Sequence, residues 1–345
     1  PVASLLRGFS APVRLTADQS ESDLLTLMSG DDDDFVAWDA AQSLLARTIE
    51  ALDLAGQEAK IHNALLEAIE RVLTGPMDAA MKALTLCLPS EEYLADRAAQ
   101  RGLVDMTDIH LRRQAVKRLL GQALDSQWRA VSSQSVVGSP YSASAHEIGV
   151  RSLRHLALDY LLAAQSASLT QAEQLLESAD NLTDRLAALR WIAQYANGAQ
   201  REQTLANFYD RWKRESLVVN QWFTVQATRP DISCVESVRE LLNHDAFDWR
   251  NPNKLRALVG AFSAANPLAF HRVDGAGYQL LGDVITRIQS SNPQIAARML
   301  APLTRWRRYA VGQDAMKAEL ERIAGIDPLP KDVFEVVNRS LAEPD

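Results

Sequence analysis

The chain has 345 residues, of which 47% are hydrophobic and 23% are charged, a composition typical of a soluble globular protein with a substantial core. A formal net charge of −8, with no long block of lysine or arginine, argues against nucleic acid or an anionic membrane as a partner. No apolar run reaches the roughly 18 residues needed to cross a bilayer, and the two cysteines, Cys87 and Cys234, are too few for a disulfide framework, which suits the reducing cytoplasm.

The first segment, residues 1–15, reads PVASLLRGFSAPVRL and contains two prolines and an extended-looking APVRL run. This pattern predicts a strand-like arm that pairs with something before it. The chain begins with Pro1 rather than Met, as if in mid-structure, and we interpret it as a piece of a longer protein.

From about residue 21 onward, apolar residues recur at three- and four-residue spacing, and no segment keeps the alternation of a strand. Glycine and proline are sparse, at 15 and 13 residues, which also favours helix over sheet. The short turns between helices predict antiparallel helix pairs stacked into an all-α superhelical solenoid of the HEAT or armadillo kind. The predicted helical stretches before residue 230 are 23–30, 31–52, 62–73, 78–88, 90–100, 108–131, 146–164, 169–179, 182–196 and 202–222, with a Ser/Gly-rich loop at 132–144.

Four consecutive aspartates, residues 31–34, precede the second helical stretch. Such a cluster could bind a metal, but acidic residues at a helix start more often favour its positive dipole end or lie in water.

His146 and Glu147 look like the beginning of an H-E-x-x-H zinc motif, which needs a second histidine four residues after the first. That position is Val150, and the next histidine, His155, lies nine residues on, at about the opposite side of a helix at 100° per residue. We therefore predict no metal site and no cofactor in this chain.

Other catalytic motifs are also missing: the sequence contains no G-x-S-x-G, no P-loop and no G-x-G-x-x-G. Gly275 and Gly277 predict a turn followed by a packed tyrosine, Tyr278.

A weak internal repeat occurs near the end of the chain. The stretches RNPNKLRALVGAF and SNPQIAARML each place an Asn-Pro pair at a helix start, with Asn251 and Asn292 41 residues apart, within the period of HEAT-type repeats. Asparagine is a good N-cap, and proline in the first helical position sacrifices no hydrogen bond. A third pair, at Asn266, lies between them. We expect the two helices to run side by side and to begin at the same edge.

These two helices carry the candidate binding residues Arg256, Gln294 and Arg298. Gln294 and Arg298 are spaced i, i+4 and so share a helix face. Two guanidinium groups and an amide at one edge could receive a carboxylate or a peptide backbone, whereas the ordinary alternative is that they are solvated or in weak ion pairs.

The sequence contains seven collinear blocks: PVASLLRGFSAPVRL, WDAAQSLLA, LTDRLAAL, WFTVQAT, NPNKLRALVGAF, NPLAFHRVDGAGY and NPQIAARML. Together they resemble the bacterial aminopeptidase N family, the zinc gluzincin or alanyl aminopeptidases. The resemblance covers essentially the whole chain but corresponds only to the C-terminal domain of that multidomain enzyme.

The resemblance implies that residues 1–15 end a preceding β domain and that residues 16–345 form a C-terminal helical superhelix. In the family, the H-E-x-x-H and G-x-M-E-N motifs lie upstream, in the zinc-binding catalytic domain, and neither occurs here. The resemblance implies a cytoplasmic enzyme that removes N-terminal residues from peptides, with this domain capping the active-site chamber. Arg256, Gln294 and Arg298 match positions that line the chamber beyond the scissile bond.

The partners implied are the upstream catalytic and β domains and peptide substrates, and this chain alone should be inactive. The alternative is an independent helical-repeat scaffold that binds a protein partner on its concave face, because a fold does not fix a function.

Overall fold

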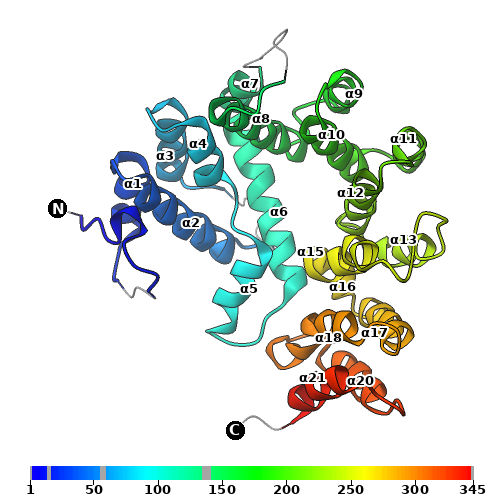
Figure 1. Cartoon of the computed structure of the whole chain (residues 1–345). Helices are drawn as coiled ribbons and strands as arrows, with labels where there is room; N and C mark the ends of the chain where they lie inside the picture. The colour runs from blue at the N-terminus through cyan, green and yellow to red at the C-terminus, as the bar shows by residue number, and fades with distance from the viewer. Residues whose placement is uncertain (1, 14–16, 55–59, 134–140, 343–345) are drawn as a thin grey trace. The chain divides into compact units, whose positions relative to one another are not determined.

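The computed structural model describes residues 2–13, 17–54, 60–133 and 141–342. Helices fill the described part of the chain and no β-strand occurs in it, apart from a single isolated bridge between Val104 and Tyr309 (Figure 1). The all-α class predicted from the sequence is confirmed. The domain boundary predicted at residues 15–16 and most of the loop predicted at 132–144 lie outside the described residues.

The chain divides into two compact units, each of which we describe by itself. Unit 1 comprises Pro1–Leu94 and Leu111–Trp191, and unit 2 comprises Ala95–His110 and Ile192–Asp345. The helices up to residue 195 are α1 (Glu21–Gly30), α2 (Asp34–Ala51), α3 (Asn63–Thr74), α4 (Ala79–Leu86), α5 (Glu91–Ala99), α6 (Met106–Ala123), α7 (Asp125–Ser132), α8 (Ala145–Ala163), α9 (Leu169–Ser178) and α10 (Leu182–Tyr195), preceded by a 3-10 turn η1 (Arg7–Phe9). The later ones are α11 (Gly198–Trp212), α12 (Ser216–Ala227), α13 (Cys234–Leu241), α14 (Pro252–Leu255), the π turn η2 (Arg256–Gly260), α15 (Ala261–Ala265), α16 (Pro267–Phe270), α17 (Ala276–Ile288), α18 (Pro293–Met299), α19 (Ala301–Thr304), the 3-10 turn η3 (Trp306–Arg308), α20 (Gln313–Ala324) and α21 (Lys331–Leu341).

Unit 1 is held together by close packing of α1 on α2, α2 on α4, and α8 on both α4 and α7. Helices α4 and α8 approach closely at Gly149, where a Cβ would lie 2.8 Å from the backbone nitrogen of Ala80. Trp128 of α7 stacks on Tyr160 of α8, with ring centroids 4.6 Å apart, and the Tyr160 hydroxyl donates to the Leu86 carbonyl of α4 at 2.8 Å. One buried aromatic pair therefore joins three helices.

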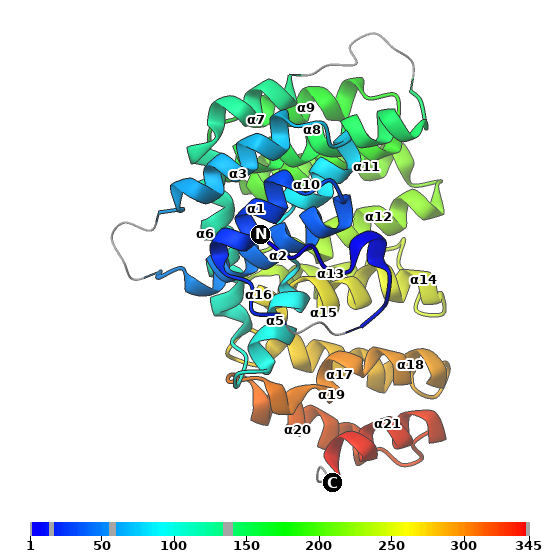
Figure 2. The same ribbon diagram turned by 90° about the vertical axis from the view of Figure 1, so that its left-hand side faces the viewer.

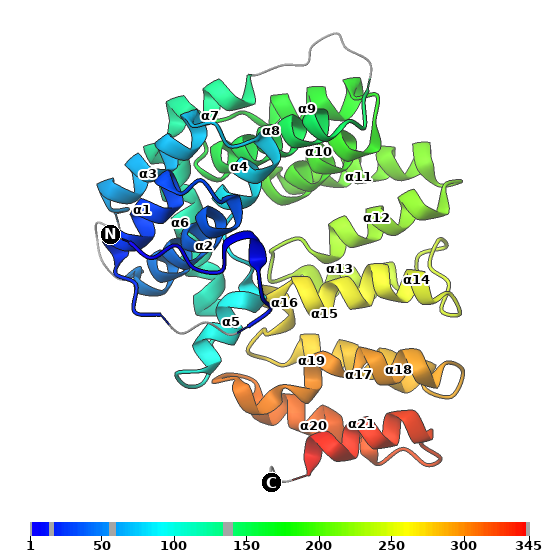
Figure 3. The same cartoon turned by 60° about the vertical axis from the view of Figure 1, so that its left-hand side comes forward.

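Unit 2 contains helix pairs stacked in successive layers (Figures 2 and 3). Helices α17 and α18 pack on each other, α20 and α21 do the same, and the two layers meet through α17 on α20 and α18 on α21. Successive helix pairs that stack layer on layer are the arrangement of a solenoid of repeats.

Two predicted helical stretches are each divided in the structure. The stretch 108–131 breaks at Leu124 between α6 and α7, and the stretch 202–222 breaks between α11 and α12, where Glu215 is extended. In each case the second helix leaves the direction of the first, and a tryptophan indole donates to a carbonyl of the first helix, from Trp128 to Leu120 at 3.1 Å and from Trp222 to Leu205 at 2.9 Å. Burial of these indoles favours the change of direction over one long helix.

The Asn-Pro helix starts are confirmed. The side chains of Asn251, Asn266 and Asn292 accept backbone N–H bonds at 2.9, 3.3 and 3.3 Å and cap α14, α16 and α18. In Figure 3, α14 and α18 lie at the same edge of unit 2, as the repeat predicts.

Candidate functional site

The first candidate residue, Arg256, lies where the helix that begins at Asn251 changes its winding. It is the first residue of η2, and the N–H of Ala261 donates to the Arg256 carbonyl five residues earlier. The residues that flank it on the inner side, Leu255 and Leu258, are fully buried. Arg256 itself is exposed, and its Nη1 donates to the side-chain oxygen of Asn253 at 3.0 Å.

Gln294 and Arg298 lie one turn apart on α18 and both are exposed. The inner face of the helix is formed by Ile295, Ala296 and Met299, all buried. This confirms that the i, i+4 spacing places the two polar side chains on the outer face. Within the described residues, neither side chain forms a hydrogen bond or an ion pair, so their donors are available to a ligand.

All three candidates therefore belong to unit 2, on the two helices that begin at the same edge (Figure 3). Guanidinium and amide groups of this kind donate to carbonyl and carboxylate oxygens and fix their direction. Each of these groups could therefore hold a carbonyl or carboxylate oxygen in a fixed direction. The three side chains themselves include no nucleophile and no general base.

Sequence reasoning missed a third cation near Arg256, the side chain of Lys254. It is 6% exposed, its Nζ lies 5.3 Å from the ring centroid of Phe223 on α12, and burial lowers its pKa. No carboxylate pairs with it in the part of the chain that the structure describes. No pattern in the sequence marks Lys254, because a lysine in the first turn of a helix is usually solvated.

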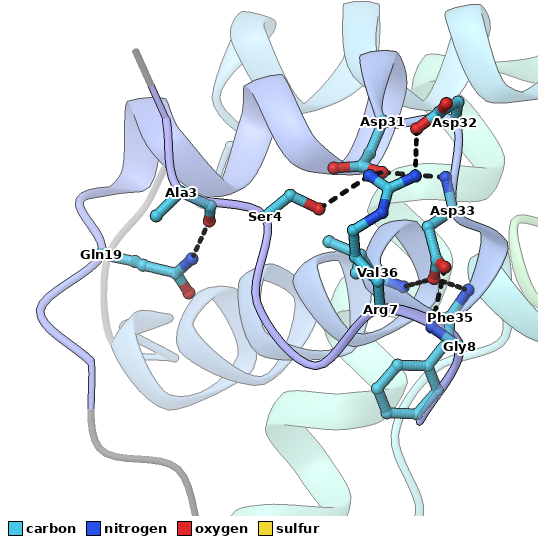
Figure 4. A network of polar contacts seen from close by, with 10 residues as sticks. All are labelled: Ala3, Ser4, Arg7, Gly8, Gln19, Asp31, Asp32, Asp33, Phe35 and Val36. Carbon is cyan, nitrogen blue, oxygen red and sulfur yellow. Dashed lines mark hydrogen bonds and ion pairs between the residues drawn. The ribbon is translucent and has the colours of Figure 1, made fainter. Parts of the chain in front are cut away.

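Three of the four aspartates at residues 31–34, Asp31, Asp32 and Asp33, bind the N-terminal segment (Figure 4). Arg7 donates to Asp31 at 3.0 Å and to Asp32 at 2.5 Å, and the Gly8 N–H donates to Asp33 at 2.7 Å. Asp33 also caps α2 by accepting from the N–H groups of residues 35 and 36, as expected for acids at a helix start.

The strand-like conformation expected for residues 1–15 is not found in residues 2–13. Leu6, Gly8 and Phe9 have φ values of 53°, 61° and 53°, in the left-handed region that a strand cannot contain. The hydrogen bonds from Arg7 and Gly8 to the aspartates stabilise this compact turn. The Phe9 ring also packs on Phe35, with ring centroids 5.1 Å apart.

His146 and His155 have separate surroundings on α8. His146 is exposed near the helix start, whereas Nε2 of His155 lies 2.6 Å from Oδ1 of buried Asp184. Arg154 donates to the same oxygen at 3.0 Å and Asn181 donates to the other at 2.9 Å. Burial by itself would raise the pKa of Asp184, but these hydrogen bonds and the charge of Arg154 outweigh it and hold the pKa well below its usual value. The group is a structural link between α8 and α10.

No three His, Cys, Asp or Glu side chains of the described residues are grouped so that they could hold a metal ion. None of the helices in residues 2–13, 17–54, 60–133 and 141–342 combines the length and the hydropathy of a membrane span. Cys87 and Cys234 are free thiols, and burial raises the pKa of both.

Comparison with known proteins gives a matching family model, similar proteins and a similar solved structure. A family model described as "Domain of unknown function (DUF3458_C) ARM repeats" matches residues 21–342. The proteins named aminopeptidase N of Haemophilus influenzae and Escherichia coli are 36% and 37% identical to the chain over 346 and 349 residues. Each alignment covers 99% of this chain and 39% of the relative, so the chain spans well under half the length of these relatives.

A solved structure, the crystal structure of Legionella pneumophila aminopeptidase A in complex with aspartic acid, is also similar. It superposes with a TM-score of 0.87 at 28% sequence identity, over 98% of this chain and 40% of that chain.

Proposed function

The chain belongs to the DUF3458_C family of ARM-repeat domains and resembles the C-terminal helical domain of bacterial aminopeptidase N, and from this we propose that it serves a zinc-dependent aminopeptidase as the domain that binds peptide beyond the scissile bond. In this proposal the enzyme removes N-terminal amino acids from peptides. The chain caps the active-site chamber and controls access to it, as residues 16–345 of a longer polypeptide in which residues 1–15 follow a β domain.

The observation that carries the proposal is the pair Gln294 and Arg298, exposed on one face of α18 with no side-chain partner among the described residues. Arg256 adds a second guanidinium on the helix that begins at the same edge. Side chains so placed would donate to a peptide carbonyl or a terminal carboxylate, and so hold the peptide in register.

The catalytic zinc and its ligands would lie in the part of the enzyme that this chain does not span, where the metal would supply Lewis-acid chemistry at the scissile carbonyl. The residues described here would only bind and orient the peptide. We also propose a cytoplasmic location, which the two free thiols fit.

The proposal is tested with Arg298→Ala in the full-length enzyme. Hydrogen bonds to charged groups contribute about 1.5–3 kcal/mol, so kcat/KM for tripeptides should fall by about ten- to a hundredfold. An alanyl anilide, which lacks the peptide extension, should be affected much less.

A matched control is Arg339→Ala, an exposed arginine in the last turn of α21, the helix stacked on α18. This variant should change neither substrate by more than about twofold. Equal losses on both substrates for Arg298→Ala, or no loss on either, would show that Arg298 is structural or merely solvated.

A further inference from the structure

The helix that carries Arg256 contains one turn wider than an α-helix. In an α-helix the N–H of Ala261 would donate to the carbonyl of Ala257, four residues earlier. Here it donates to the carbonyl of Arg256, five residues earlier, as in a π turn, and it also contacts the carbonyl of Leu258 rather than that of Ala257. The widened turn therefore leaves the Ala257 carbonyl without its usual helical donor.

A threonine on another helix supplies the missing donor. The hydroxyl of Thr224 on α12 donates to the Ala257 carbonyl at 3.0 Å, and it is shared with the Asn220 carbonyl of its own helix at 3.1 Å. This contact is partly buried, and α12 packs closely against η2 along its length. A partly buried carbonyl without a donor costs free energy, so the Thr224 hydroxyl favours the π turn over a regular turn.

The widened turn sets the direction of Arg256. Each residue of an α-helix advances by about 100°, so a turn with one extra residue rotates Arg256 by about that angle relative to residues 261–265. Residues 261–265 are fixed by the fully buried Phe262, and the guanidinium is steadied by Asn253. A regular turn would present Arg256 to a different side.

We propose that Thr224 is a positioning residue for peptide binding: through the Ala257 carbonyl it maintains the π turn that aims Arg256 at the peptide. The inference rests on the proposed function, because Arg256 is the group that Thr224 positions. Thr224 lies in the WFTVQAT block, residues 222–228, for which the sequence alone predicts no role in peptide binding.

The test uses the full-length enzyme with Thr224→Val, which keeps the shape of the side chain and removes its hydroxyl. We expect KM for tripeptides to rise about three- to tenfold, with kcat and the alanyl anilide changed by less than about twofold. Thr224→Ser, which restores a hydroxyl, should recover most of the loss.

Thr228→Val is the matched control, since Thr228 caps the C-terminal end of α12 and its hydroxyl donates to the Thr224 carbonyl at 2.8 Å. It removes the same group from the same helix without touching η2, and it should leave KM for tripeptides within about twofold of the parent. An equal rise in KM for Thr224→Val and Thr228→Val would overturn the proposal, since both would then act only through α12.

Arg256→Ala separates failure of this inference from failure of the proposed function. If Arg256→Ala raises KM for tripeptides, Thr224→Val added to it should cause no further rise, because its effect passes through Arg256. A normal KM for Thr224→Val beside a raised one for Arg256→Ala would overturn this inference alone. A normal KM for Arg256→Ala would overturn the role of Arg256 and this inference with it.

Discussion

We expect the free energy of unfolding of unit 2 to depend on pH through one side chain, the buried ring of His271. It is 9% exposed, one ring nitrogen lies 2.9 Å from the Tyr278 hydroxyl, and its ring centroid is 4.5 Å from that of Tyr309. Burial, together with the positive charge of Arg308, lowers the pKa of His271 to about 4. The folded chain therefore keeps this imidazole neutral at pH values where the unfolded chain would protonate it.

This lowered pKa predicts acid sensitivity between pH 6.5 and 4. The stabilisation from a neutral His271 is complete above the unfolded value of about 6.5 and is lost as the pH falls toward 4. Between pH 7.5 and 5.0 the free energy of unfolding should fall by about 2 kcal/mol on this account. Urea titrations of the parent and of His271→Gln at the two pH values measure the difference, which should be smaller in the variant.

His146→Gln is the control for that measurement, because His146 is exposed on α8. It should lose stability toward pH 5.0 as much as the parent does. If His271→Gln behaves in the same way, the acid sensitivity comes from other groups.

Among the elements, the N-terminal segment is held to the α1–α2 junction mainly by polar contacts. Arg7 pairs with Asp31 and Asp32, while one oxygen of Asp33 binds the Gly8 N–H and the other caps α2 (Figure 4). Arg7 is about half exposed and its partner Asp32 is 87% exposed, so water and salt weaken this ion pair, while the side chain of Asp31 is largely buried. The segment should therefore be the part of unit 1 that is easiest to release.

We predict that Arg7→Ala releases residues 2–13 with little change in the midpoint of global unfolding. Phe9, which is 55% exposed, should then be cleaved by chymotrypsin several-fold faster, as followed by mass spectrometry. Lys213→Ala removes an exposed ion pair within a single helix, with Asp210 at 3.0 Å, and should leave cleavage at Phe9 unchanged. Equal cleavage in Arg7→Ala and the parent would mean that the Phe9–Phe35 contact alone holds the segment.

At the scale of the whole molecule, the described residues of the two units include structural polar links and candidate binding residues. Asp184 of unit 1 is saturated by Arg154, His155 and Asn181, and the aspartates at residues 31–33 are taken up by Arg7 and backbone N–H groups. Arg256, Gln294 and Arg298 of unit 2 can bind and orient, but catalysis needs groups beyond them.

We therefore expect the purified chain to contain no stoichiometric zinc and to release no product from an alanyl chromogenic substrate. Metal analysis and a rate assay, run beside the full-length enzyme as a positive control, measure both. One tightly held zinc per chain, with turnover abolished by a chelator, would contradict the proposal that the catalytic zinc lies in a part of the enzyme that this chain does not span.

The sequence by itself determined the features that depend on neighbours along the chain. The spacing of apolar residues predicts the helices, the Asn-Pro pairs at Asn251 and Asn292 predict helix starts, and the i, i+4 spacing of Gln294 and Arg298 predicts their shared face. Each of these follows from the period of an α-helix or from the bonding of its first turn, which the local sequence fixes.

Only the tertiary structure decided which groups meet across helices. Arg7 with the aspartates at residues 31–32, His155 with Asp184, and Thr224 with the Ala257 carbonyl join residues 24 to 33 positions apart. The π turn at Arg256 belongs with them, because the residues 256–260 form an ordinary helical sequence and the donor that supports the turn comes from α12. Such contacts depend on how helices pack, and packing follows from the simultaneous burial of many side chains rather than from any local pattern.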